Sequence, residues 1–152
     1  MRVKGTARKI VVTSCTAMDD PLSTATALNT PMFSWATRAS RAKVVRVIDG
    51  DTVHVAMHLP GDAGPTKHIV RLGGIDAPEL HGPNRDLAAT ARDALAKLVL
   101  DRIVTIDIRP KPDKYGRMLA DLKLEDGTNV NDYMMQHGLA SMYDGRGRKF
   151  DP

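Results

Sequence analysis

Two aspartates in the sequence have the type and the setting of ligands for a hard divalent cation. Asp51 follows the turn-forming pair Asp49-Gly50, and Asp76 follows an apolar stretch that ends at Ile75. If the strands that carry them pair, the two carboxylates can meet at one edge of a barrel. Carboxylate oxygens with room for water suit Ca²⁺ or Mg²⁺ better than a soft metal. The sequence therefore predicts a Ca²⁺ site, with Mg²⁺ or Mn²⁺ as alternative ions.

Three further charged residues have the chemistry to act on a phosphodiester at such a site. Glu79 comes one residue after Pro78, whose ring restricts the preceding backbone and can hold the carboxylate at a fixed distance. A carboxylate there could orient a water molecule and deprotonate it. Arg71 lies in an otherwise apolar stretch and Arg117 directly follows a glycine. Their guanidinium groups can grip a phosphate and stabilise the charge of a five-coordinate transition state.

These residues belong to four short motifs that occur in a fixed order. The motifs are residues 47–53 (VIDGDTV), 70–79 (VRLGGIDAPE), 113–120 (DKYGRMLA), and Asn131 followed by residues 138–140 (GLA). Any one motif alone is a weak signal, but all four in this order and spacing are a strong one. Together they resemble staphylococcal nuclease and its small relatives, over about residues 43–145.

The resemblance implies a calcium-dependent nuclease that cleaves single-stranded DNA and RNA at the 5′ P–O bond and leaves 3′-phosphates. It implies that Asp51 and Asp76 are calcium ligands, together with the backbone carbonyl of Ala77. The family often has threonine at the position of Ala77, but a backbone oxygen can come from alanine too. Asp49 matches an acid that lies near the metal without binding it.

The same resemblance implies roles for the residues that would act on the substrate. Glu79 matches the proposed general base, and Arg71 and Arg117 match the phosphate-binding arginines. Lys114 and Tyr115 match residues that hold the terminal phosphate of a bound nucleotide.

The sequence departs from the family prototype near its C-terminal end. The prototype continues with another long helix, whereas residues 143–149 look like the short tail of compact bacterial and phage relatives. Tyr143 is the one candidate for the tyrosine pair that lines the nucleotide base. We therefore expect base stacking to be weak.

The elements that must position these residues follow from the periodicity of apolar residues and from turn residues. Strands are expected at residues 43–48, 52–57, 67–75, 102–108 and 118–124. A helix is expected from Asn84 or Asp86, with an apolar stripe made of Leu87, Ala91, Leu95 and Leu98. A short helix is expected at residues 130–137, ended by Gly138, and residues 141–152 read as a polar tail. This order predicts an α+β, mainly β fold: a five-stranded OB-fold barrel with two to three helices.

The chain is expected to have an extended N-terminal arm, residues 1–40, and a nuclease-type domain, residues 41–152. The arm is rich in Ser, Thr and Ala and carries a net charge of +3, whereas the domain carries +1. A domain so close to neutral would bind a polyanion through a few positioned cationic side chains rather than through an overall positive potential. Met32, Phe33 and Trp35 form an apolar group in the arm that could dock on another protein.

Several classes of protein are disfavoured. Cys15 is the only cysteine, so an internal disulfide and a zinc site with several thiolates are excluded. No apolar run approaches the roughly 20 residues that a membrane helix needs. The apolar run before the polar pair Thr13-Ser14 and Cys15 is only residues 10–12 (IVV). This run is too short for the apolar region of a signal peptide. We therefore expect an unprocessed N-terminus, no membrane partner, and a location in the cytoplasm or inside a viral or other large assembly.

Two other functions are compatible with the same fold. One is a non-catalytic module that binds nucleic acid, and the other is a structural component of a larger assembly such as a virion. Asp49-Gly50 alone is most often a simple turn, and Arg71 could pair with Asp76 only for stability. The joint presence of Asp51, Arg71, Asp76, Glu79 and Arg117 favours the enzyme.

Overall fold

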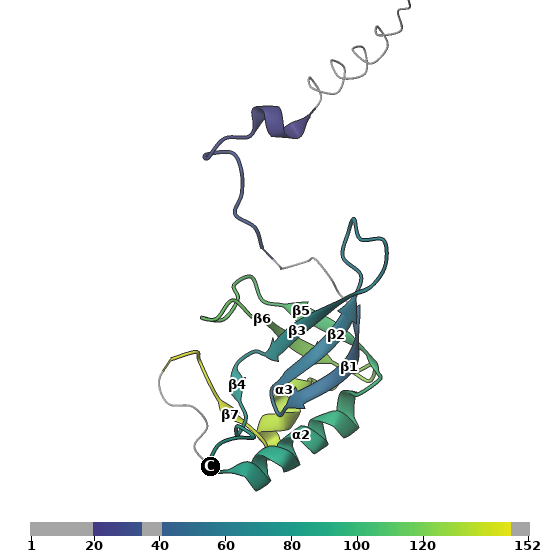
Figure 1. The fold of residues 1–152 in the computed structure, drawn as a ribbon, viewed down its shortest axis with the longest axis vertical. Coiled ribbons are helices and arrows are strands. Elements are labelled where there is room, and N and C mark those ends of the chain that lie inside the picture. The colour runs from purple at the N-terminus through teal and green to yellow at the C-terminus, as the bar shows by residue number, and fades with distance from the viewer. Residues whose placement is uncertain (1–19, 35–40, 147–152) are drawn as a thin grey trace, which may run out of the picture. The chain divides into compact units, whose positions relative to one another are not determined.

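The computed structural model describes residues 20–34 and 41–146, and the chain divides into two units, Met1–Phe33 and Ser34–Pro152 (Figure 1). The described part of the first unit contains the 3-10 helix η1 (Pro21–Thr24), whose N-terminus is capped by the side chain of Asp20. Leu28 and Met32 are almost fully exposed. Cys15 and Trp35 lie outside the described residues, and the predicted boundary between arm and domain stays a prediction.

Five strands of the second unit close into a barrel in the order β1-β2-β3-β6-β5. They are β1 (Arg41–Asp49), β2 (Thr52–Met57), β3 (Thr66–Leu72), β5 (Ile103–Ile108) and β6 (Met118–Lys123). The first three strands form an antiparallel meander, and β3 and β6 pair in parallel to close the barrel. The predicted α+β, mainly β OB-fold barrel is confirmed.

Two helices pack against the barrel. Helix α2 (Arg85–Val99) crosses beneath it in Figure 1 and contacts β1, and helix α3 (Val130–Gln136) packs against β6. Asn129 caps α3 by accepting a hydrogen bond from the backbone of Asp132, and Gly138 lies just past its end with a φ of 68°. Within the described ranges, no helix combines the length and the apolar character that crossing a membrane requires.

The expected apolar stripe of the long helix is wrong in part. Its buried residues are Ala88, Ala91, Leu95 and Val99, whereas Leu98 is only partly buried and Leu87 is not part of the buried core. The buried face is thus centred on two alanines, whose small side chains let the helix lie close to the barrel. Asn84 takes the N-cap position, but its side chain makes no capping hydrogen bond.

The third strand and the C-terminal tail also differ from the prediction. The strand ends at Leu72, and a turn at Gly73-Gly74, with a φ of 77° at Gly74, separates it from the short strand β4 (Ile75–Asp76). Strand β4 pairs with β7 (Ser141–Met142), which falls inside the predicted polar tail. Because β4 leaves the barrel sheet, Asp76 is carried to the edge of the barrel rather than along its wall.

The turn between β1 and β2 packs unusually closely against its neighbours. A methyl group on Gly50 would lie 2.6 Å from Cβ of Ala77 and 2.8 Å from Cβ of Ala91. Only a residue without a side chain fits between β4 and α2 at this point. The contact brings the turn that carries Asp49 and Asp51 against the backbone at Ala77.

We expect Gly50→Ala to lower the free energy of unfolding by about 1–3 kcal/mol, because an added carbon in a packed region forces backbone shifts. The matched control is Gly64→Ala, where the added carbon meets no atom within 4 Å. Urea unfolding of both variants measures the difference. Equal stability of the two variants would show that the turn is loosely packed.

Candidate active site

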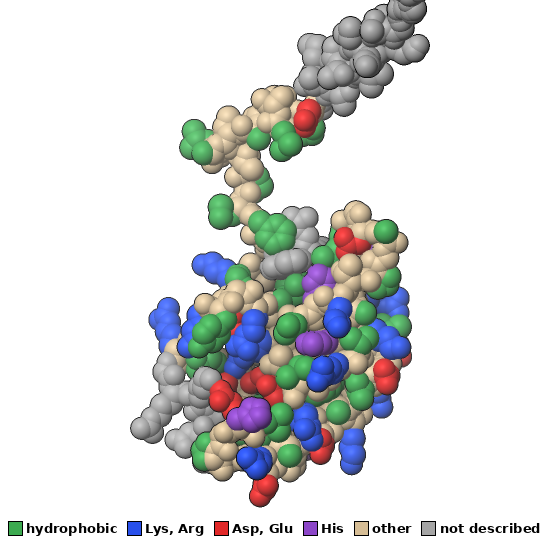
Figure 2. All heavy atoms as spheres, viewed as in Figure 1, with side chains coloured by type: hydrophobic (Ala, Val, Ile, Leu, Met, Phe, Trp, Pro, Cys, Tyr) green, Lys and Arg blue, Asp and Glu red, His purple; other side chains and the backbone are tan. Residues whose placement is uncertain are grey.

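The predicted site residues line one pocket of about 310 Å³ at the edge of the barrel. The residues from the predicted set that line it are Asp49, Asp51, Arg71, Asp76, Ala77, Glu79, Lys114, Tyr115, Arg117 and Tyr143. In Figure 2, acidic side chains gather beside Lys and Arg side chains on one face of the molecule. Their roles remain predictions, but the structure brings all of them together.

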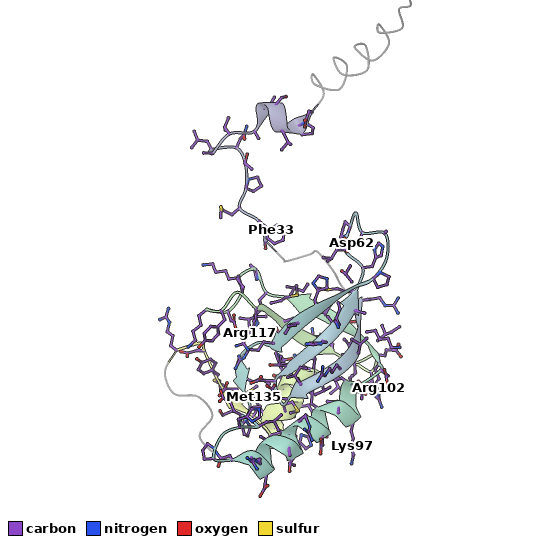
Figure 3. The ribbon with its side chains drawn as sticks, in the orientation of Figure 1. Phe33, Asp62, Lys97, Arg102, Arg117 and Met135 are labelled. Atoms are coloured by element: carbon purple, nitrogen blue, oxygen red, sulfur yellow. The ribbon has the colours of Figure 1, made fainter. Side chains whose placement is uncertain are left out.

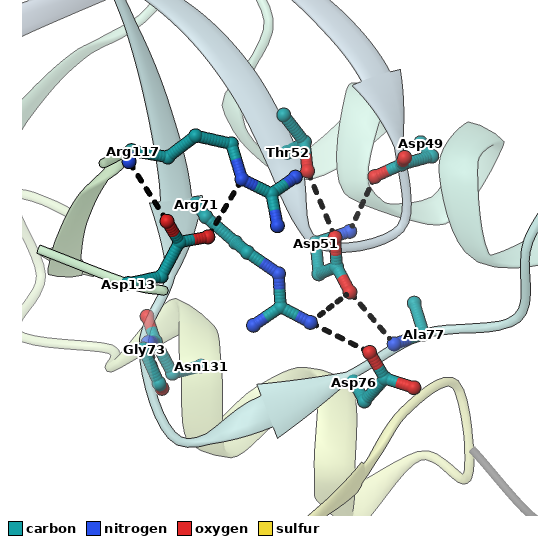
Figure 4. A network of polar contacts seen from close by, with 10 residues as sticks. All are labelled: Asp49, Asp51, Thr52, Arg71, Gly73, Asp76, Ala77, Asp113, Arg117 and Asn131. Atoms are coloured by element: carbon teal, nitrogen blue, oxygen red, sulfur yellow. Dashed lines mark hydrogen bonds and ion pairs between the residues drawn. The ribbon is translucent and has the colours of Figure 1, made fainter. Parts of the chain in front are cut away.

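Arg71 joins the two predicted metal ligands. One terminal nitrogen of its guanidinium lies 2.6 Å from Asp76 Oδ1 and 3.3 Å from Asp51 Oδ2 (Figure 4). All three residues are buried. Arg71 is therefore a buried arginine with two charged partners. Its ion pairs with both acids offset the cost of removing its charge from water.

Asp51 is held from several sides. Its Oδ2 accepts a hydrogen bond from the backbone N–H of Ala77 at 2.9 Å, and its Oδ1 accepts one from the Thr52 hydroxyl at 2.8 Å. Its own N–H donates to Asp49 Oδ1 at 3.1 Å. These contacts fix the direction of the carboxylate and hold the β1–β2 turn against the backbone that follows β4.

The pocket carries more negative charge than its buried arginine balances. Burial and the nearby charge of Asp49 raise the pKa of Asp51 to about 6, although Arg71, the Ala77 N–H and Thr52 act in the opposite direction. Acids whose pKa values are shifted by burial and by nearby charges cluster at functional sites. Positive charge brought into this pocket would stabilise the ionised carboxylate.

Arg117 reaches the pocket from the loop that precedes β6. Asp113 Oδ2 accepts a hydrogen bond from Arg117 Nε at 2.6 Å, and Asp113 Oδ1 accepts from the backbone N–H groups of Tyr115 and Arg117. Burial alone would raise the pKa of Asp113, but these donors and the guanidinium charge lower it below its ordinary value. The loop is thereby closed around one carboxylate, and Arg117 contacts Asp113 through Nε.

Aromatic rings flank both arginines. The Tyr115 ring centroid lies 5.1 Å from Lys114 Nζ and 5.3 Å from Arg117 Cζ. The Tyr143 ring centroid lies 5.6 Å from Arg71 Cζ, and the Tyr143 backbone N–H donates to the Gly74 carbonyl. Strand β7 therefore places Tyr143 over Arg71, a position that spacing along the sequence does not reveal.

Two residues that support the site were not assigned a role from the sequence. Asn131 donates to the carbonyl oxygens of Gly73 and Ala120 and to Asp121 Oδ1, and it accepts from the backbone N–H of Leu122. Its only signal in the sequence is its place in the fourth motif.

Arg109 is the second of these supports. Its guanidinium pairs with Asp121 at 3.0 Å and lies so close to Gly73 that a methyl group there would be 2.5 Å from Arg109 Cζ. In the sequence, this contact is indicated only by the glycine pair Gly73-Gly74, which leaves room for the arginine. Together with Asn131, Arg109 holds the turn that leads from β3 into β4.

The donor set of the pocket fits a hard divalent ion that keeps several water ligands. Among residues 20–34 and 41–146, no three His, Cys, Asp or Glu side chains are grouped so that they could hold a metal by themselves. Asp51 and Asp76 offer two buried carboxylates, and Ala77, which has a backbone carbonyl oxygen, lines the pocket beside them. Oxygen donors completed by water are the usual environment of Ca²⁺ and Mg²⁺, whereas a soft metal finds no thiolate or imidazole in this lining.

Comparison with known proteins agrees with this geometry. Residues 69–151 match the family model described as "Staphylococcal nuclease homologue". The chain is 36% identical over 115 residues to an "uncharacterized endonuclease" of Escherichia coli O157:H7, covering 74% of this chain and 69% of that protein. It is 38% identical over 120 residues to the protein ParB of Escherichia coli, covering 74% and 62%. It is 34% identical over 119 residues to a micrococcal nuclease of Shigella flexneri, covering 73% and 63%.

We expect Asn131→Ala to lower the free energy of unfolding by about 1–3 kcal/mol, because it removes the buried hydrogen bonds that this amide makes with Gly73 and Leu122. Asn84→Ala is the control, since the Asn84 side chain makes no capping hydrogen bond. Chemical denaturation followed by circular dichroism compares the two. A variant at position 131 that is as stable as the control would mean that the turn at Gly73 holds its shape without this amide.

Proposed function

Because this chain belongs to the family of staphylococcal nuclease homologues, we propose that it is a Ca²⁺-dependent nuclease of single-stranded DNA and RNA that leaves 3′-phosphates. One observation carries the proposal: a single pocket contains the buried carboxylates of Asp51 and Asp76, the guanidinium groups of Arg71 and Arg117, and the exposed residue Glu79. A module that only binds nucleic acid has no need for this excess of acid in its binding pocket.

Asp51 and Asp76 would hold the cation, with the backbone carbonyl of Ala77 as a further ligand. Asp49 would stay behind Asp51, where its carboxylate already accepts the Asp51 N–H. When bound, Ca²⁺ would supply positive charge against the oxygens of the scissile phosphate. Mg²⁺ or Mn²⁺ would fit the same oxygen donors with different geometry.

Glu79 would act as the general base. It lines the same pocket as the carboxylates and is exposed, so a water molecule can approach it. Glu79 would take a proton from the water as its oxygen attacks phosphorus. The P–O5′ bond breaks, the leaving oxygen takes up a proton, and the phosphate stays on the 3′ side.

Arg71 and Arg117 would neutralise the charge that grows on the phosphate oxygens. Arg71 is already desolvated between two acids, so a phosphate can replace part of its carboxylate contact without a new cost of burial. Arg117 is oriented by Asp113 through Nε, which leaves its outer edge turned to other partners. Lys114 and Tyr115 would hold a terminal phosphate, and Tyr143 would face the base.

Residues 1–40 are proposed to contact another protein, as in a larger assembly such as a virion. In the described part of this segment, Leu22, Leu28 and Met32 are 78%, 100% and 92% exposed. Apolar side chains this exposed often mark a contact surface.

The test of the enzymatic proposal is a comparison of Glu79→Gln with the parent protein. The parent should cleave single-stranded DNA and RNA with Ca²⁺ and lose this activity in chelator. Glu79→Gln should lower the rate roughly a hundred- to ten-thousandfold, the range expected when a general base is removed. Its affinity for a nucleoside bisphosphate, measured by calorimetry with Ca²⁺, should change little because Asp51, Asp76 and both arginines remain.

Glu125→Gln is the matched control, since Glu125 is exposed and lies outside the pocket. It should cleave at the parent rate. Cleavage by Glu79→Gln at the parent rate would assign the base to another group. A parent that binds the nucleotide but never cleaves would be a binding module.

Removal of residues 1–40 is expected to leave cleavage and the melting temperature of the barrel nearly unchanged, because β1 begins at Arg41. The assembly state should change, as measured by light scattering of the full and truncated chains. A truncated chain that does not fold would make the segment part of the domain. An unchanged assembly state would contradict the proposed protein contact of residues 1–40.

A further inference from the structure

The outer face of β1, β2 and β3 carries two rows of side chains whose positions follow from the register. Lys43, Ala56 and Lys67 lie opposite one another across the three strands and form one row. Arg46, His54 and Ile69 form the next row. On β2, Val55 lies between the two rows and is buried, and His68 opposite it on β3 is half-buried. The next inward pair, Val53 and Val70, is also buried in the barrel. We call these six outward residues the outer-face track.

An irregularity in β1 turns Arg46 outward. The register shifts between Val44 and Arg46, so that Arg46 rather than Val45 lies opposite His54. Without the shift, Arg46 would lie opposite the fully buried Val53. A β-bulge that re-aims a side chain in this way often has a functional reason.

The charge of the track is of one sign. Strands β1, β2 and β3 contain only one acid, Asp49, and it lines the pocket. None of the ion pairs found among the described residues involves Lys43, Arg46 or Lys67. Figure 2 shows blue and purple side chains spread over the region where Figure 1 places these strands. The cationic surface ends at the β2–β3 loop, which carries the acid Asp62, labelled in Figure 3.

The track is continuous with the pocket. Thr52 and Arg71, both pocket residues, are paired across β2 and β3 and form the row next to His54 and Ile69. Successive rows on one face of a strand are about 7 Å apart. A strand of nucleic acid that leaves the pocket past Arg71 therefore meets Arg46 and then the two lysines.

The uncharged members of the track suit the bases of such a strand. Ile69 is 51% exposed, and His54 and Ala56 are partly exposed between the cations. Proteins that bind single strands without sequence preference combine a cationic groove along the backbone with aromatic rings on which bases stack. His54 is the ring of this track, and Ile69 adds exposed apolar surface beside it.

We propose, on the basis of the proposed nuclease function, that the outer-face track binds the part of a single-stranded nucleic acid that extends beyond the pocket. Phosphates contact Lys43, Arg46 and Lys67, and bases lie over Ile69 and His54. The track gives the domain a preference for long strands over very short ones. It supplies attraction for a polyanion that a domain with a net charge of +1 lacks as a whole.

The test uses the full chain in chelator, where binding is measured by fluorescence anisotropy without relying on cleavage. A single strand of about 12 nucleotides, within the usual site size of such folds, is compared with a dinucleotide. The triple variant Lys43→Gln, Arg46→Gln, Lys67→Gln should lower the affinity for the long strand roughly tenfold or more. The slope of log affinity against log salt should become less negative by about 2, as expected for three lost phosphate contacts.

The control triple variant Arg92→Gln, Lys97→Gln, Lys123→Gln removes the same charge from α2 and β6. It should keep the parent affinity, and both variants should melt like the parent. Equal losses in the two variants, an unchanged affinity of the first, or no preference of the parent for the long strand would each overturn the proposal. So would equal displacement of the long strand by a polyglutamate peptide. Cleavage with Ca²⁺ is scored separately, so an inactive parent whose binding follows the pattern refutes only the nuclease function.

Discussion

The burial of Arg71 between Asp51 and Asp76 is the constraint on which the rest of the site depends. Moving three charges out of water costs several kcal/mol for each ion, and their mutual attraction offsets this only when the geometry is good. Two acids and one arginine do not balance, and Asp49 and Glu79 in the same pocket add to the excess of acid. Such a cluster is poor as a device for stability. Its arrangement is understandable if a cation and a phosphate complete it.

The geometry of this cluster is produced by turns rather than by the strands themselves. Gly50 lets the β1–β2 turn touch Ala77 and Ala91, which brings Asp51 within hydrogen-bonding distance of the Ala77 backbone. The Gly73-Gly74 turn releases β4 from the barrel, and Asn131 holds that turn from α3. Each supporting contact joins elements that are themselves fixed by the apolar core. The carboxylates are therefore held by rigid neighbours, which is what a site with defined geometry requires.

The sequence predicted the barrel and the members of the pocket because both depend on short-range patterns. Alternation of apolar residues indicates strands, and motifs such as DGD and DAPE keep their acids next to the turns that place them. The sequence did not predict contacts between distant segments. Asn131 reaches the Gly73 carbonyl across 58 positions, and β7 pairs with β4 across a similar gap. The helix stripe was wrong at Leu87 and Leu98, because close packing on the barrel favours the face with Ala88 and Ala91.

A protein that holds a cation and also binds a polyanion must separate its charges in space. An acidic pocket attracts the cation but repels the phosphates, and cations inside the pocket would do the reverse. Here the acids are concentrated at the β1–β2 turn and β4, while the outer-face track on β1, β2 and β3 presents lysine and arginine. The two regions share one sheet face, and Arg71 stands at their boundary, paired with the acids but on the same side of β3 as Lys67 and Ile69. In the proposed function, a phosphate that approaches along the cations would meet Arg71 before it meets an acid. This order of encounter would let a nearly neutral domain admit a strand of negative charge to an acidic centre.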